Sequence, residues 1–138
     1  GMEADMATEL GILTCLMILA ASMWIPYVVG IVTDPSKEDA FYTPADIRNL
    51  RPWVQRAHRA HANLLEQAIP FAVLVLLVDK ASGFTALTYW TAIAFFWLRV
   101  AHALGHISGV AKEPLRPIIF TAGWICVMIM AYSVFAAG

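Results

Sequence analysis

Two groups of polar side chains with helical spacing interrupt long apolar stretches of this sequence. The spacing is i, i+4, i+7 in the first group and i, i+3, i+7 in the second, so each group occupies one face of a helix. The groups are Arg59, Asn63 and Glu66, and Arg99, His102 and His106, with Arg116 following further along the chain. Guanidinium groups bind planar anions through paired hydrogen bonds. Arginines in excess of carboxylates therefore favour a site for an anionic ligand.

A second interpretation of the same residues is structural. Glu66 could form an ion pair with Arg99 or with Arg59 that only fixes the register of two helices. Three arginines around one carboxylate exceed what such a pair requires, and this excess favours a binding site. Exposure of these groups to lipid is costly. We therefore expect the two polar faces to lie against each other or against a partner subunit.

The histidines raise the question of a metal or haem site. His102 and His106 stand at i, i+4, which is a spacing used by metal ligands. Nearby arginines, however, disfavour a bound cation. No cysteine lies close by in the sequence. We therefore predict no metal and no haem.

The elements that must position these residues are membrane spans. Of the 138 residues, 60% are hydrophobic and only 14% are charged. A bilayer core needs roughly 20 apolar residues of helix, and a soluble chain of this size has too little interior to bury several such segments. The sequence predicts an all-α integral membrane four-helix bundle in one domain, with spans at about 7–32, 57–78, 84–106 and 115–136. The two cysteines, Cys15 and Cys126, are expected to be buried, inert thiols.

The basic residues predict the orientation of the bundle. Eight of the nine Lys and Arg residues fall on one side of the predicted spans, and Lys80 falls on the other. Those eight are Lys37, Arg48, Arg51, Arg56, Arg59, Arg99, Lys112 and Arg116. The positive-inside rule places that side, with the polar cluster, in the cytoplasm and both termini opposite. Thr43–Asp46 reads as a helix start at the membrane surface. The net charge of −1 gives no reason to expect nucleic acid.

At these residues the chain resembles the MAPEG family, the membrane-associated proteins in eicosanoid and glutathione metabolism, as a bacterial-type member. Residues 59–66, read as Arg-Ala-His-Ala-Asn-Leu-Leu-Glu and followed by Pro70, are similar to the signature of the second family helix. Arg99-Val-Ala-His102, with Arg116 and Phe120, is similar to the signature of the third and fourth. The similarity covers about residues 10–135.

The resemblance implies a homotrimer that binds glutathione, as co-substrate, between neighbouring subunits on the cytoplasmic side. Asn63 and Glu66 then correspond to residues that bind the glutathione backbone. Arg59, Arg99 and His102 correspond to groups that frame its carboxylates, and Arg116 to the arginine that lowers the thiol pKa. His106 and Phe120 stand where some family members carry tyrosines that contact the tripeptide.

Three functions remain as hypotheses at this stage. The first is a glutathione-dependent membrane enzyme, a transferase or peroxidase, acting on lipophilic electrophiles or hydroperoxides that reach it from membrane lipid. The second is a non-catalytic trimeric membrane protein whose polar cluster is structural. The third is a transporter, although no pair of spans carries the Gly- or Pro-broken helices expected at a transport site.

Overall fold

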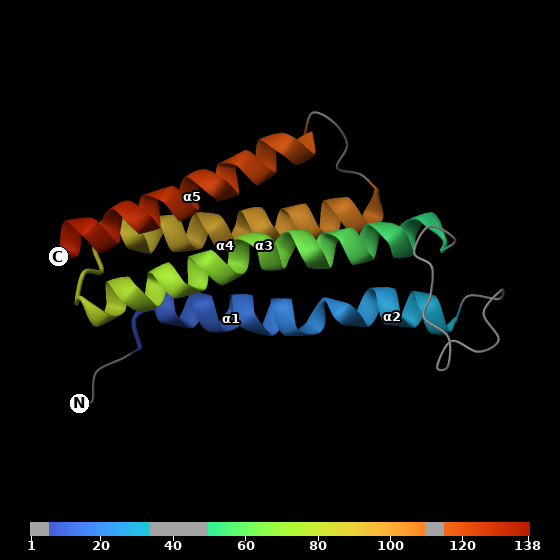
Figure 1. Cartoon of the computed structure of the whole chain (residues 1–138), viewed down its shortest axis with the longest axis horizontal. Helices are drawn as coiled ribbons and strands as arrows, with labels where there is room; N and C mark the ends of the chain where they lie inside the picture. The colour runs from blue at the N-terminus through green and yellow to red at the C-terminus, as the bar shows by residue number, and fades with distance from the viewer. Residues whose placement is uncertain (1–5, 34–49, 110–114) are drawn as a thin grey trace.

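The structure, a computed structural model, describes residues 6–33, 50–109 and 115–138. These residues form helices that lie side by side and alternate in direction along the chain (Figure 1). The helices are α1 Thr8–Ser22, α2 Trp24–Val32, α3 Pro52–Lys80, α4 Ala86–Ser108 and α5 Leu115–Ala137. The prediction of an all-α bundle is confirmed. The predicted surface helix at Thr43–Asp46, and the basic residues Lys37, Arg48 and Lys112, lie outside the described residues.

The first predicted span is divided into two helices. α1 ends at Ser22 and α2 begins at Trp24, with Met23 forming the junction. The cause is Pro26, which has no N–H to donate to the carbonyl of Ser22 four residues earlier. The two helices continue in one direction (Figure 1). The sequence predicted the extent of this span and missed the break.

Local signals explain where α3 and α4 begin and end. Pro52 occupies the first turn of α3, where its missing N–H leaves no helical hydrogen bond unmade. Thr85 caps α4 in a reciprocal arrangement with Thr88: each side-chain oxygen accepts from the other residue's backbone N–H. α4 ends at Ser108 and is followed by Gly109, whose φ of 80° suits a residue without Cβ.

Three of the four helical segments have the length and apolar character of membrane spans. They are Thr8–Val32, Pro52–Lys80 and Leu115–Ala137. The segment predicted at 84–106 is the 23-residue α4, which at ~1.5 Å per residue is roughly 34 Å long. It is long enough, but Arg99 and two histidines make it less apolar. Its place as a fourth span therefore stays a prediction.

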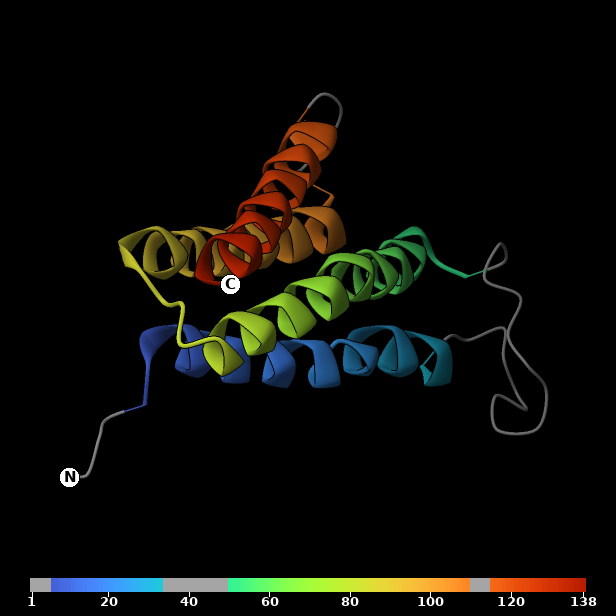
Figure 2. The same cartoon turned by 60° about the vertical axis from the view of Figure 1, so that its left-hand side comes forward.

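α3 is the central helix of the bundle. It packs against α1, α2, α4 and α5, and in Figure 2 it lies between α1–α2 on one side and α4–α5 on the other. Its small and aliphatic residues face inward, and Phe71 stacks on Phe95 of α4 with ring centroids 4.0 Å apart. Cys126 is buried as expected, but Cys15 is exposed on the outer surface of α1, so that prediction was wrong.

Candidate functional site

The polar face of α4 points into the bundle. Arg99, His102 and His106 are 0%, 2% and 3% exposed, and they lie toward one end of the helix. We call this the pocket end: the end of the bundle formed by the C-terminal part of α4 and the N-terminal parts of α3 and α5. The first residues of α1 and the last of α5 lie at the opposite end (Figure 1).

Arg99 is held by Gln67 and not by Glu66. Nη1 of Arg99 donates to Oε1 of Gln67 at 2.9 Å, and Nε2 of Gln67 donates to the backbone oxygen of Phe120 at 2.9 Å. Gln67 therefore joins α3, α4 and α5 at one point. Sequence analysis missed this residue. Its spacing of four from Asn63 could have placed it on a polar face of α3.

The contact of Gln67 with α5 depends on a glycine. A Cβ added at Gly123 would lie 2.4 Å from Oε1 of Gln67, which is much closer than van der Waals contact allows. Gly123 is buried in α5, one turn from Phe120. The absence of a side chain there lets the amide of Gln67 reach the helix backbone. A close helix–helix approach at a small residue is common in membrane bundles.

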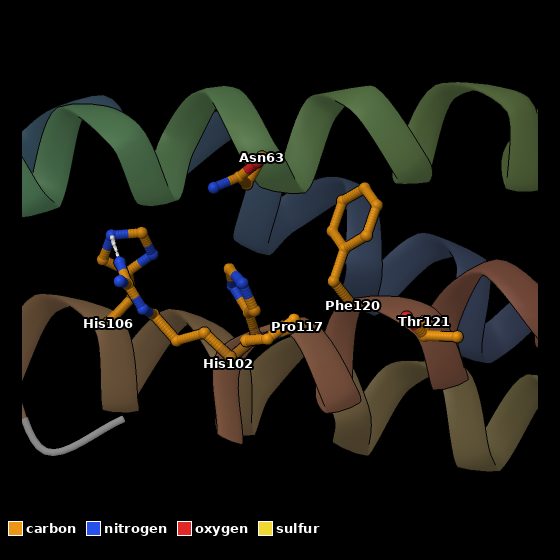
Figure 3. Close-up of a pocket in the computed structure, with 7 residues that line it drawn as sticks. Asn63, His102, His106, Pro117, Phe120 and Thr121 are labelled. Atoms are coloured by element: carbon orange, nitrogen blue, oxygen red, sulfur yellow. Dashed lines mark hydrogen bonds between the residues drawn. The ribbon is translucent and has the colours of Figure 1, made fainter. Parts of the chain in front are cut away.

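A cavity of about 370 Å³ opens between α3, α4 and α5 at the pocket end. Its lining consists of Asn63, His102, His106, Arg116, Pro117, Phe120 and Thr121. Figure 3 shows Asn63 on one side of this space, with the two histidines and the α5 residues opposite. Nη1 of Arg116 lies 3.5 Å from Nε2 of His106. Of the seven predicted site residues, the structure brings four together around the cavity.

The remaining predicted residues do not line this cavity. Arg99 lies deeper, completely buried, while Arg59 and Glu66 are exposed on the outer face of α3. The expected alternative in which the two polar faces meet within one chain is therefore wrong for Arg59 and Glu66. The reason is that the neighbouring face of α3, with Ala60 and Leu64, is less polar and packs inward. Glu66 forms no ion pair with any residue in the described ranges.

The buried polar groups at the pocket end are incompletely satisfied. In the part of the chain that the structure describes, Nε and Nη2 of Arg99 have no hydrogen-bond partner, and neither does Nδ1 of His102 or of His106. Buried polar groups are nearly always paired, so such exceptions require a reason. Arg99 offers two spare donors and a positive charge. Arg99 does not line the cavity, so it can favour an anion there through its charge and not by direct contact.

A second buried polar contact lies at the other end of the bundle, which we call the Glu9 end. Glu9, in the first turn of α1, is 4% exposed, and Oγ1 of Thr88 donates to its Oε2 at 2.6 Å. Thr88 belongs to the capping arrangement of α4. Sequence analysis missed this contact because nothing in the spacing of Glu9 and Thr88 links them.

A third group of ring contacts joins α2 to α3. The ring of Tyr27 contacts those of His58 and His61, with centroid distances of 5.3 and 5.7 Å. Within the described ranges, no group of three or more His, Cys, Asp or Glu side chains is placed to hold a metal ion.

Comparison with known proteins identifies the family. The family model described as "MAPEG family" matches residues 11–136 of the chain. No curated protein matches the chain. Because the match spans nearly the whole sequence, the chain belongs to the MAPEG family, which includes glutathione-dependent membrane enzymes. The family resemblance noted from residues 59–66 and 99–102 is confirmed.

Proposed function

We propose that this MAPEG protein is a glutathione-dependent membrane enzyme. It would conjugate glutathione to lipophilic electrophiles, or use glutathione to reduce lipophilic hydroperoxides. The observation that carries the proposal is the cavity at the pocket end, where Asn63, His102, His106 and Arg116 converge. Glutathione carries two carboxylates and one ammonium group. Cationic donors around an amide side chain, with the Glu66 carboxylate on the adjoining face, suit that charge pattern.

Arg116 is the residue that we assign to catalysis. Its guanidinium lines the cavity, and a nearby cation stabilises a thiolate relative to the thiol. In conjugation, the thiolate sulfur forms a bond to the electrophilic carbon while a halide or other leaving group departs with its electron pair. In peroxide reduction, two glutathione molecules become one disulfide, and the hydroperoxide becomes an alcohol and water.

The substrate-binding set that we propose is larger than the cavity lining. Asn63, His102 and His106 line the cavity, and Arg99 acts from behind it through its buried charge. Arg59 and Glu66 are exposed on α3. Exposing a carboxylate to lipid within a membrane span is energetically costly. We propose that a second copy of the chain buries Glu66. Closed cyclic symmetry would bury this face in every subunit, and a homotrimer would complete the site from two subunits.

The proposed orientation places the pocket end in the cytoplasm. The described Arg51, Arg56 and Arg59 lie in the first turns of α3 or just before it, and Arg116 lies in the first turn of α5. Lys80 closes α3 at the other end. This distribution follows the positive-inside rule. α4 is then the remaining membrane span, with its polar face covered by α3 and α5.

Binding of glutathione is the direct test. Purified protein in detergent or nanodiscs is titrated with reduced glutathione, and its melting temperature is followed over the same concentrations. A ligand that binds only the folded state stabilises it by about 2.7 kcal/mol at 100 times its Kd. Glutamate and glycine supplied together as free amino acids are the control. A flat titration and an unchanged melting temperature would contradict the proposal.

The competing function is a non-catalytic trimeric membrane protein. The Gln67 contacts favour it, since they tie three helices and could serve stability alone. Native mass spectrometry and an activity assay separate the two. A trimer that neither binds glutathione nor conjugates an aryl halide would support the non-catalytic function. A monomer would count against both, because the completed site requires a neighbouring subunit.

A further inference from the structure

Two basic side chains that line the cavity contact each other. Nη1 of Arg116 lies 3.5 Å from Nε2 of His106, the contact drawn as a dashed line in Figure 3. A guanidinium group can only donate hydrogen bonds, whereas a neutral imidazole has one donor and one acceptor nitrogen. A hydrogen bond between the two groups therefore requires Nε2 of His106 as the acceptor. The proton of the neutral ring then resides on Nδ1.

Other states of the ring fit the contact poorly. If Nε2 carried a proton, two N–H groups would point at each other. A doubly protonated ring would also place two positive charges close together in a site where His106 is only 3% exposed, where screening by water is weak. Nδ1 has no hydrogen-bond partner in the described ranges, so no opposing contact there selects the other tautomer.

We propose that His106 is a positioning residue for Arg116. Its neutral imidazole accepts a hydrogen bond from the guanidinium and fixes it at the cavity without adding a negative charge beside it. This inference rests on the proposed function, in which Arg116 stabilises a thiolate. A carboxylate at position 106 would hold the arginine equally well. Its charge, however, would oppose that of the thiolate and disfavour ionisation of the thiol.

The surrounding structure holds His106 in place for this role. Nε of Arg56, on α3, donates to the backbone oxygen of Ile107 at 3.1 Å, and Gly109 ends the helix just beyond. The last turn of α4 is thereby anchored to α3. Arg99 is held in a comparable way, because its observed acceptor, Gln67, is also neutral.

Three substitutions at position 106 separate positioning from simple packing. His106→Gln supplies a neutral acceptor, His106→Glu an acceptor of the same length with a negative charge, and His106→Leu supplies neither. With glutathione bound, the thiolate fraction near neutral pH should rank Gln above Leu above Glu. We expect the bound thiol's pKa in the Glu variant to rise by at least about one unit, which is a tenfold lower ratio of thiolate to thiol.

Thermal stability should rank differently. The Glu variant should melt at or above the temperature of the Gln variant, since it gains an ion pair with Arg116, and the Leu variant should melt lowest. If His106 positions Arg116, the three variants should rank in a different order by thiolate fraction than by melting temperature. If the thiolate fraction simply follows stability, with Glu equal to or above Gln, the inference is overturned.

A measurement without glutathione separates this inference from the proposed function. Protein labelled with 15N-histidine is studied by NMR at neutral pH, and the His106 signals are assigned by their loss in His106→Gln. We expect an unprotonated Nε2 and a protonated Nδ1. A protonated Nε2 would overturn the inference even if glutathione binds. The expected tautomer in a protein that fails to bind glutathione would support the His106–Arg116 geometry and refute the proposed function.

Discussion

The two ends of the bundle bury polar groups in opposite ways. At the Glu9 end, a carboxylate meets a hydroxyl at 2.6 Å, and that hydroxyl also belongs to the cap of α4. At the pocket end, Arg99 is fully buried yet keeps two nitrogen donors without partners in the described ranges, next to a cavity of about 370 Å³. Paired polar groups stabilise a fold, whereas unpaired buried donors require another reason. Arg99 does not line the cavity, so its buried charge, and not these donors, is what can act on a ligand there.

The two ends of α4 therefore have different roles: one contributes to stability and the other to the proposed function. Thr88 and His106 lie near opposite ends of α4, and both carry buried polar atoms. We therefore expect substitutions at the Glu9 end to lower stability and leave glutathione binding intact. Substitutions at the pocket end should alter ligand binding or thiol ionisation. The predictions below test that separation from the largest expected effect to the smallest.

Gln67→Met should have the largest effect on stability, because it removes the observed acceptor of a buried guanidinium. Leaving a buried polar group without its hydrogen-bond partner costs about 1–3 kcal/mol, and more when that group is charged. The variant should show a large fall in melting temperature, measured in the same detergent as the unmodified protein. Gln67→Glu keeps an acceptor for Arg99 but loses the donor to the Phe120 oxygen. Its melting temperature should therefore lie between those of the Met variant and the unmodified protein. Equal melting temperatures for Met and Gln would show that another group already pairs with Arg99.

Thr88→Val should destabilise the Glu9 end without affecting the pocket. The change removes the donor to Glu9 and one half of the α4 cap, and an unsatisfied buried polar group costs about 1–3 kcal/mol. Glu9→Gln keeps an oxygen that can accept from Thr88 and should retain most of the stability. Glutathione affinity should stay within about twofold in both variants that still fold. A marked loss of affinity in Thr88→Val would show that the two ends are coupled.

Arg116→Ala tests the chemistry of the pocket end. Removing the cation should raise the pKa of bound glutathione thiol by about one unit, which corresponds to about 1.4 kcal/mol and a tenfold change in ionisation. The thiolate absorbance near neutral pH should fall, and conjugation to an aryl halide should slow in parallel. Arg116→Lys keeps a positive charge and should retain part of the effect. Unchanged thiolate absorbance in the Ala variant, with glutathione bound, would leave Arg116 as an interfacial anchor.

The sequence predicted the helices well because their signals are local. Apolar runs predicted the spans, whereas the start of α3 at Pro52, five residues before the predicted span, and the cap of α4 at Gly109 were recognised only in the structure. The break at Met23 was missed although Pro26 is visible in the sequence. A proline inside a helical stretch can either kink the helix or divide it in two, and the sequence alone did not distinguish these outcomes. The identity of α4 as a helix was clear, whereas its membrane-spanning role depends on what covers its polar face.

The site was predicted less completely because it depends on which face of α3 turns inward. Helical spacing placed Arg59, Asn63 and Glu66 together, but it could not tell whether that face meets α4 or a neighbouring chain. The structure turns Gln67 inward and Glu66 outward, although the two are adjacent in sequence. Packing of α3 against α5 at Gly123 decides this, and no spacing rule within α3 contains that information.

Arg56→Ala is expected to give the smallest effect and tests how tightly α4 is anchored at the pocket end. Nε of Arg56 donates to the Ile107 oxygen at 3.1 Å, one of the last carbonyls of α4, which lack helical donors. A partly buried contact of this kind contributes about 0.5–1.5 kcal/mol. We expect a small fall in melting temperature and a small loss of thiolate fraction, because His106 precedes Ile107 and would hold Arg116 less firmly. Arg56→Lys keeps a cation near the helix end and should recover most of the stability. A change in stability with no change at all in thiolate fraction would mean that the position of His106 does not depend on this anchor.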